Sequence, residues 1–243
     1  MKRERSRLRS TMVRSMRPRA VSTCAALALF VLASGCKSKS IPGNPALGDP
    51  SLAKDTAPET FAVRFDTTAG DIVLSCTRSW APHGVDRFYN LVKIGFFDDV
   101  AFFRVVRSPT PFVAQFGIHG NPDVNERWLE RTIEPDEPKQ SNTRGRLTFA
   151  MADKPSTRAT QLFINYADNT SLDRLGFAPI CEVTEGMQNA EKLYDGYGEG
   201  LTEAQGKIAK EGNAFLRKEY PKLDYIKSAK LVEAAPPTAS ARP

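Results

Sequence analysis

Short runs in which apolar and polar residues alternate recur along most of the chain, and they constrain the fold more than any other feature. Phe61, Val63 and Phe65 alternate with polar neighbours, and Ile72 and Leu74 continue the pattern after the turn T-T-A-G-D. A period of two indicates strands buried on one face, and the turn between the runs predicts a hairpin. Further strands are predicted at Val100–Val106, Phe112–Gly117, Arg146–Ala152, Gln161–Tyr166, Ile180–Val183 and Asp224–Glu233.

Two segments, far apart in the sequence, have a helical period. Pro82 suits a first helical turn and Gly95 suits a stop, and one face between them is apolar through Val85, Phe88, Leu91 and Val92. Later, Thr202–Gln205 has the pattern of a capping box before a helix with the apolar residues Ile208, Phe215 and Leu216, weakened by Gly212. Many short strands with two separated helices favour a closed antiparallel barrel with helices over its ends.

The first 35 residues are typical of an export signal. A basic stretch ends at Arg19, and the apolar stretch Ala20–Ala33 is shorter than the roughly 20 residues that a membrane span needs. The following L-A-S-G-C, which ends at Cys36, resembles the lipobox of bacterial lipoproteins. That resemblance implies cleavage before Cys36 and lipid on its sulfur, and Lys37 weakly favours the outer membrane. An ordinary signal peptide and an uncleaved anchor are the alternatives.

The net charge of +6 is confined to the signal segment. Residues 1–35 hold eight basic residues and one acidic residue, which leaves the remainder with a net charge of −1. A near-neutral domain lacks the basic stripe that phosphate binding requires, so a nucleic-acid partner is excluded.

Composition divides the chain into four parts. We predict a signal peptide at 1–35, a lipidated cysteine with a flexible linker at 36–60, one folded domain at 61–233, and a disordered tail at 234–243. The linker is rich in Pro, Gly, Ser and Asp, the tail is rich in Ala and Pro, and the linker shows no apolar period.

Conventional catalytic motifs are missing from the sequence. The two histidines, His83 and His119, have no Cys or His partner at metal-binding spacing, and both are predicted to be surface residues. No nucleophile elbow, phosphate loop or dinucleotide fingerprint is present. We therefore expect neither a metal nor a cofactor.

Two segments carry the most specific pattern. The first is V-A-F-F-R-V-V-R-S-P-T-P-F-V-A-Q-F-G (Val100–Gly117), and the second is G-R-L-T-F-A-M-A-D-K-P-S-T-R-A-T-Q-L-F-I-N (Gly145–Asn165). In this order they resemble the cyclophilin family of peptidyl-prolyl cis-trans isomerases, and most closely its divergent bacterial branch. The resemblance implies a mainly β fold: a closed eight-stranded antiparallel barrel capped by two helices, with a helical insertion before the last strand, at Gly196–Glu219.

The resemblance also implies roles for individual residues. It makes Arg104 the essential cation. Three more residues share the catalytic site with it: Phe112, Gln115 and Phe163. Substrate-binding positions follow in the same way at Val113, Ala152, Asp153, Gln161, Leu172 and Phe177. The implied substrates are proline-containing polypeptides. Together with the export signal, this predicts that exported proteins are the substrates. We expect the enzyme to be a monomer anchored in the cell envelope.

The chemistry explains why so few groups suffice. Resonance across an amide bond opposes rotation with a barrier of about 18–20 kcal/mol. At the twisted midpoint the nitrogen lone pair becomes localised, and a fixed guanidinium donor in a dry pocket can stabilise it. We expect Arg104→Ala to lose at least a hundredfold in activity.

Departures from the family pattern keep alternatives open. Phe103 replaces a histidine, and Ser171 stands where many members have a tryptophan that binds cyclosporin, so we expect poor affinity for that drug. A non-catalytic proline-peptide module and a lipid-binding envelope protein are the other hypotheses. The family barrel would bring Cys76 near Cys181, which leaves open whether they form a disulfide or two buried thiols.

Overall fold

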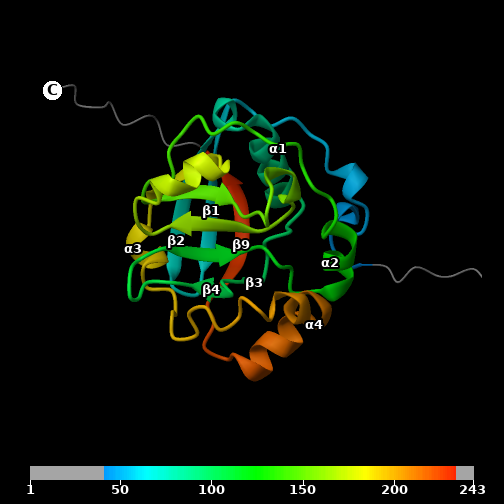
Figure 1. Ribbon diagram of the computed structural model, residues 1–243. Helices are drawn as coiled ribbons and strands as arrows, with labels where there is room; N and C mark the ends of the chain where they lie inside the picture. The colour runs from blue at the N-terminus through cyan, green and yellow to red at the C-terminus, as the bar shows by residue number, and fades with distance from the viewer. Residues whose placement is uncertain (1–40, 234–243) are drawn as a thin grey trace, which may run out of the picture. The chain divides into compact units, whose positions relative to one another are not determined.

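The computed structural model describes residues 41–233 (Figure 1). Nine strands form one antiparallel sheet in the order β3-β9-β1-β2-β8-β6-β7-β5-β4. Their bounds are β1 Thr60–Thr67, β2 Gly70–Thr77, β3 Val100–Ala101, β4 Arg104–Val105, β5 Val113–Phe116, β6 Arg146–Phe149, β7 Leu162–Asn165, β8 Pro179–Glu185 and β9 Tyr225–Val232. The predicted hairpin is the β1–β2 pair, whose register runs from Thr60 opposite Thr77 to Thr67 opposite Gly70.

The prediction of a closed, eight-stranded barrel is wrong. The run Val100–Val106, predicted as one strand, supplies both edge strands of the sheet, β3 and β4. β3 pairs with β9 and β4 pairs with β5, and no hydrogen-bonded ladder joins them within the described residues. Phe102 and Phe103, which separate them, bury their side chains and interrupt the pairing. The sheet is therefore a curled, open half-barrel whose two edges are connected by the chain itself.

Within residues 41–233, four α-helices accompany the sheet: α1 Pro82–Lys93, α2 Pro122–Trp128, α3 Met187–Ala190 and α4 Gln205–Glu219. The predictions of α1, and of α4 within the insertion before the last strand, are confirmed. α2 and α3 raise the number above the predicted two. α2 has a recognisable start, because the Asn121 side chain accepts the Asp123 backbone N–H and Pro122 occupies the first turn.

The predicted capping box before α4 does not form. Ala204 precedes the helix and makes no side-chain cap, while the Thr202 hydroxyl donates to Glu199 instead. Within α4, Gly212 has a φ of +61°, and a Cβ there would lie 2.1 Å from the carbonyl oxygen of Gly120. Only glycine permits that close approach, which brings α4 beside α2. Figure 1 shows α4 below the sheet, next to β3 and β4.

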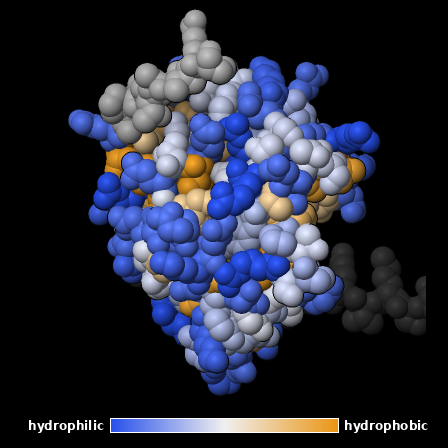
Figure 2. Space-filling model, turned by 90° about the vertical axis from the view of Figure 1, so that its left-hand side faces the viewer, coloured by the Kyte–Doolittle hydropathy of each residue, from blue (hydrophilic) through white to orange (hydrophobic). Residues whose placement is uncertain are grey.

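Aromatic rings dominate the main core. Phe65, Phe88, Phe97 and Phe116 are each fully buried, and their centroids lie 5.6–6.2 Å apart where they meet. A second cluster joins α4 to the segment between β3 and β4 through Phe103, Ile208 and Leu216. Figure 2 shows one face of the molecule on which apolar residues form small patches among hydrophilic ones.

Residues 41–59, predicted as flexible linker, instead form an N-terminal strap against the domain. Leu47 is 7 % exposed, and its carbonyl accepts the indole N–H of Trp128 at 3.2 Å. The Asn90 side chain bonds both the backbone N–H and the carbonyl of Asp55, at 3.0 and 2.7 Å. Two 3₁₀ turns, Pro45–Leu47 and Pro50–Leu52, are capped by their preceding Asn and Asp side chains. The folded unit therefore includes residues 41–59 and does not begin at residue 61.

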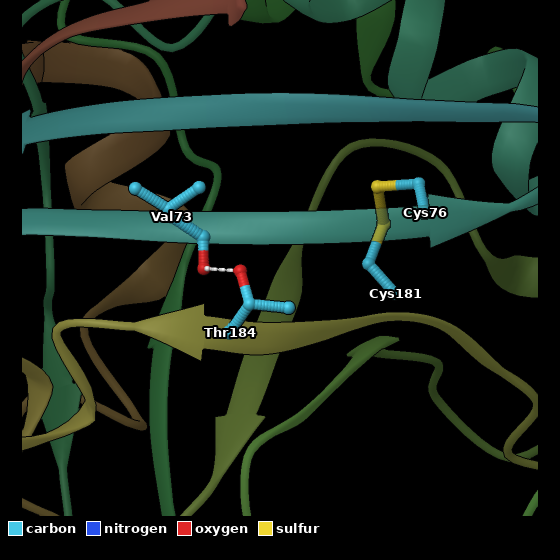
Figure 3. Close-up of a disulfide and its surroundings, with 4 residues drawn as sticks. All are labelled: Val73, Cys76, Cys181 and Thr184. Carbon is cyan, nitrogen blue, oxygen red and sulfur yellow. Dashed lines mark hydrogen bonds between the residues drawn. A yellow bond between two sulfur atoms is a disulfide. The ribbon is translucent and has the colours of Figure 1, made fainter. Parts of the chain in front are cut away.

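Cys76 and Cys181 are joined by a disulfide (Figure 3). The sequence had left open whether they form a bridge or two buried thiols. They lie directly opposite each other on β2 and β8, with 4.0 Å between their Cα atoms, and both are fully buried. Farther along the same strand pair, the Thr184 hydroxyl donates to the Val73 carbonyl at 3.3 Å. The bridge spans 105 residues of sequence and fixes the β2–β8 junction.

Several predictions concern residues outside the described range. These are the signal peptide at 1–35, the lipidated Cys36, the first part of the linker, and the tail at 234–243. Between residues 41 and 233, no helix has the length and apolar character that crossing a membrane requires.

Candidate active site

Three neighbouring strands place the predicted catalytic side chains side by side. Arg104 on β4 lies opposite Gln115 on β5, and Gln115 lies opposite Phe163 on β7. Directly opposite residues in an antiparallel sheet project to the same face. Val113, two residues before Gln115, projects to that face as well. The strand register, rather than any loop, therefore assembles the cation, the amide and one wall of the pocket.

These residues line a small apolar pocket with a volume of about 110 Å³. Val113, Phe163 and Leu172 form a hydrophobic cluster separate from the main core, and the rings of Phe163 and Phe177 meet edge to face at 5.7 Å. The volume suits one small apolar group. The full lining is Arg104, Phe112, Val113, Gln115, Ala150, Met151, Phe163, Leu172 and Phe177.

The Arg104 guanidinium lies at the rim of this pocket. Its side chain is 19 % exposed, its Nη1 donates to Gln115 Oε1 at 3.0 Å, and its Cζ lies 5.5 Å from the centroid of the Phe112 ring. Gln115 in turn donates through Nε2 to Gln161 Oε1 at 2.9 Å. The predicted glutamines thus form a chain of hydrogen bonds that begins at the cation.

Sequence reasoning missed one group at the site. Glu199, from the insertion, accepts from Arg104 Nε at 2.6 Å and from Nη2 at 2.7 Å. The hydrogen bond from Arg104 is the largest influence on this carboxyl, and it lowers the pKa of Glu199 below its ordinary value. The surrounding G-Y-G-E-G offers no periodic signal, because its contact with β4 depends on tertiary structure.

The structure does not bring Ala152 and Asp153 into the pocket. β6 ends at Phe149, earlier than the predicted Ala152, and both residues are exposed. The Ala152 backbone N–H donates to Thr157 Oγ1 at 2.8 Å. Ala152 instead lines a neighbouring cavity of about 280 Å³, together with Gln115 and Gln161.

A third cavity of about 570 Å³ lies between α2 and α4. It shares Thr160 and Gln161 with the neighbouring cavity, which itself shares Gln115 with the apolar pocket. Three adjoining hollows therefore follow one another from β4 to α4, and the sequence predicted only the first.

The two histidines differ. His83 is exposed, as predicted, but His119 is half-buried and packs edge to face on Phe96 with centroids 5.1 Å apart. Its Nδ1 accepts the Asn121 backbone N–H at 2.9 Å, and burial lowers the pKa of His119 to about 4. No group of three or more potential metal ligands occurs in residues 41–233.

Comparison with known proteins identifies similar chains. The family model described as "Cyclophilin type peptidyl-prolyl cis-trans isomerase/CLD" matches residues 62–212. Peptidyl-prolyl cis-trans isomerase B of Escherichia coli is 29% identical over 172 residues, which cover 68% of this chain and 94% of that protein. Peptidyl-prolyl cis-trans isomerase A of Dickeya dadantii is 29% identical over 136 residues, covering 54% and 70%.

Solved structures show the same fold. A crystal structure of a cyclophilin type peptidyl-prolyl cis-trans isomerase from Cryptosporidium parvum aligns with a TM-score of 0.52 at 18% identity. The alignment covers 72% of this chain and 99% of that one.

Proposed function

Because the chain belongs to the cyclophilin-type peptidyl-prolyl cis-trans isomerase family and is an enzyme of that type, we propose that Arg104 is its catalytic cation. The apolar pocket beside it binds the substrate proline ring. The observation that carries this assignment is the register of β4, β5 and β7, which sets Arg104 against Gln115 and Phe163 at one pocket. The polar rim also favours a peptide substrate over the lipid ligand considered above.

The reaction needs rotation about one bond and breaks none. With the proline ring held by Phe163, Val113 and Leu172, the preceding residue turns about the amide bond. As the amide twists, its nitrogen loses conjugation and its lone pair becomes a better acceptor. An Arg104 N–H directed at that nitrogen stabilises the twisted state more than the planar one, and this difference lowers the barrier.

The surroundings strengthen that donor. Gln115 is 8 % exposed and accepts from Nη1, which restricts the guanidinium to the rim of the pocket. Apolar walls exclude water from one side of the reacting bond, so the charge acts through a lower effective dielectric. A guanidinium keeps its charge at any physiological pH, and the mechanism requires no proton transfer.

The test is an NMR exchange assay on a proline peptide with wild type and Arg104→Ala. We expect a fall of at least a hundredfold, in the range that loss of one preorganised donor produces. Arg146→Ala is the matched control, since Arg146 is also 19 % exposed and pairs with a carboxylate, Glu182. A rate for Arg104→Ala close to wild type would overturn the assignment.

We further propose that the substrates are exported proteins and that the enzyme is a monomer anchored to the cell envelope through lipid on Cys36. The L-A-S-G-C sequence supports this proposal. The buried Cys76–Cys181 disulfide also suits an oxidising compartment. Cys36→Ser should move the protein from the membrane fraction to the soluble fraction and abolish labelling by radioactive palmitate. Unchanged fractionation and labelling would contradict the anchor.

A further inference from the structure

The insertion before β9 carries a carboxylate to the proposed catalytic cation. Glu199 makes two hydrogen bonds to Arg104, one to Nε and one to Nη2, both shorter than 2.8 Å. The Arg104 side chain is 19 % exposed, whereas that of Glu199 is 56 % exposed. The carboxylate therefore contacts the guanidinium from its solvent side.

The arrangement leaves donors free for a substrate. A guanidinium has five N–H groups in one plane. Glu199 accepts two of them and Gln115 accepts a third, so one N–H on each Nη has no partner among residues 41–233. Because two-point contacts fix a planar group more tightly than single ones, Glu199 and Gln115 together determine where the free donors point.

Glu199 is itself held in place. The Thr202 hydroxyl donates to Oε2 of Glu199 at 2.8 Å. Leu201 buries its side chain completely in the cluster that joins α4 to the segment between β3 and β4. Asn213 of α4 donates to the Asp99 carbonyl at 2.7 Å, and Arg217 pairs with the Asp99 carboxylate. The segment that presents Glu199 is thus anchored on the C-terminal side of the carboxylate.

We propose that Glu199 is a positioning residue for catalysis, which orients the Arg104 guanidinium toward the proline pocket without contacting the substrate. The proposal rests on the role of Arg104 proposed above. An arginine side chain has several rotatable bonds, and without the carboxylate only the hydrogen bond to Gln115 and the contact with the Phe112 ring would restrict the guanidinium among residues 41–233. Substrate binding depends chiefly on the apolar pocket, so loss of Glu199 lowers kcat and leaves KM nearly unchanged.

The experiment compares wild type with Glu199→Ala and Glu199→Gln, using a proline tetrapeptide. We expect kcat to fall about tenfold for Glu199→Ala and less for Glu199→Gln, which keeps one acceptor oxygen, with KM within about twofold. Glu182→Ala is the matched control, because Glu182 pairs with an arginine of the same 19 % exposure away from the pocket. That control should retain the wild-type rate.

Two further measurements separate positioning from general damage. In an Arg104→Ala background, Glu199→Ala should cause no additional loss, because the carboxylate acts only through the arginine. The ¹⁵N relaxation of Arg104 Nε should show larger fast motion in Glu199→Ala than in wild type, while the melting temperature stays within about 3 °C.

The outcomes are distinct. An unchanged kcat in Glu199→Ala, or an increase that would mark the carboxylate as an inhibitor, overturns this inference while Arg104 keeps its role. An additional loss in the Arg104→Ala background also overturns it. If Arg104→Ala itself is fully active, the proposed function fails first.

Discussion

Two arginine–carboxylate pairs in this molecule use the same chemical groups in opposite ways. The Arg158 and Asp136 side chains are 1 % and 3 % exposed and approach to 3.2 Å. The Arg104 and Glu199 side chains are 19 % and 56 % exposed and approach to 2.6 Å. The tighter contact is the more exposed one, so contact distance alone does not tell which pair maintains the fold.

The buried pair is part of a network that ties the loop before β6 to α1. Asp136 accepts the backbone N–H groups of His83 and Gly84 at 3.0 and 2.8 Å, which satisfies the start of the helix. Arg158 donates to the carbonyls of Pro155 and Glu134 as well. Burial lowers the pKa of Arg158, and the Asp136 carboxylate opposes that shift. Several backbone groups depend on this pair, whereas the hydrogen bonds of the Arg104 and Glu199 side chains within residues 41–233 go to side chains alone.

The largest expected effect is on the buried pair. Asp136→Ala should destabilise the protein by about 3–5 kcal/mol, because it leaves an uncompensated buried guanidinium and two unpaired N–H groups at the start of α1. Chemical unfolding measures the loss, and kcat per folded molecule should be unchanged. A loss below about 1 kcal/mol would remove the distinction between the two pairs.

The Cys76–Cys181 disulfide is a covalent link with which the two arginine–carboxylate ion pairs can be compared. Replacing Cys76 and Cys181 together by Ala should cost roughly 2–4 kcal/mol, because the bridge closes a long loop in the unfolded chain. Unfolding in the absence of reductant gives the value. Isomerase activity at 25 °C should remain, since neither sulfur lines the pocket; a loss of kcat in the folded variant would show that the β2–β8 junction reaches the site.

Arg104→Ala should lower activity strongly and stability only slightly, the reverse of what we expect for Asp136→Ala. Its pair with Glu199 is partly exposed, so we expect a change in unfolding free energy below about 1 kcal/mol beside the large loss of activity. Thermal unfolding and the exchange assay on one sample provide both values. A destabilisation as large as that of Asp136→Ala would show that both ion pairs maintain the fold.

The last prediction concerns His119, a half-buried histidine whose effect is confined to acidic pH. Its folded pKa of about 4 lies below the ordinary 6.5 because of burial, so the unfolded chain binds more protons between these values. Stability should therefore fall by about 2–3 kcal/mol as the pH drops from 6.5 toward 4. His119→Gln should flatten this part of the profile, whereas His83→Gln, at an exposed position, should not.

The sequence predicted the strands and most of the pocket because both depend on local pattern. Alternation identified β1 and β2, and two ordered motifs placed Arg104, Gln115 and Phe163, which the strand register then brought together. The roles of these residues stay predictions until the variants are assayed. The strand predicted to reach Ala152 ends at Phe149, so Ala152 and Asp153 lie outside the pocket, and substrate binding by their backbone stays a prediction.

Features that depend on packing between distant segments could not be predicted. The sheet stays open because Phe102 and Phe103 turn into the interior, which alternation alone cannot reveal. Glu199 reaches Arg104 across 95 residues of sequence. Residues 41–59 have the composition of a linker, yet backbone groups of Leu47 and Asp55 find hydrogen-bond partners on α2 and α1.

Because the strap packs against the domain, it shortens the length of free chain between the domain and any lipid on Cys36. A free linker from residue 36 to 60 could extend about 85 Å, whereas the five steps from Cys36 to Ile41 span at most about 18 Å. In an anchored enzyme, the start of the strap at Ile41 would then lie within about two nanometres of the bilayer surface. The enzyme's clients would be chains that emerge at, or remain close to, that surface.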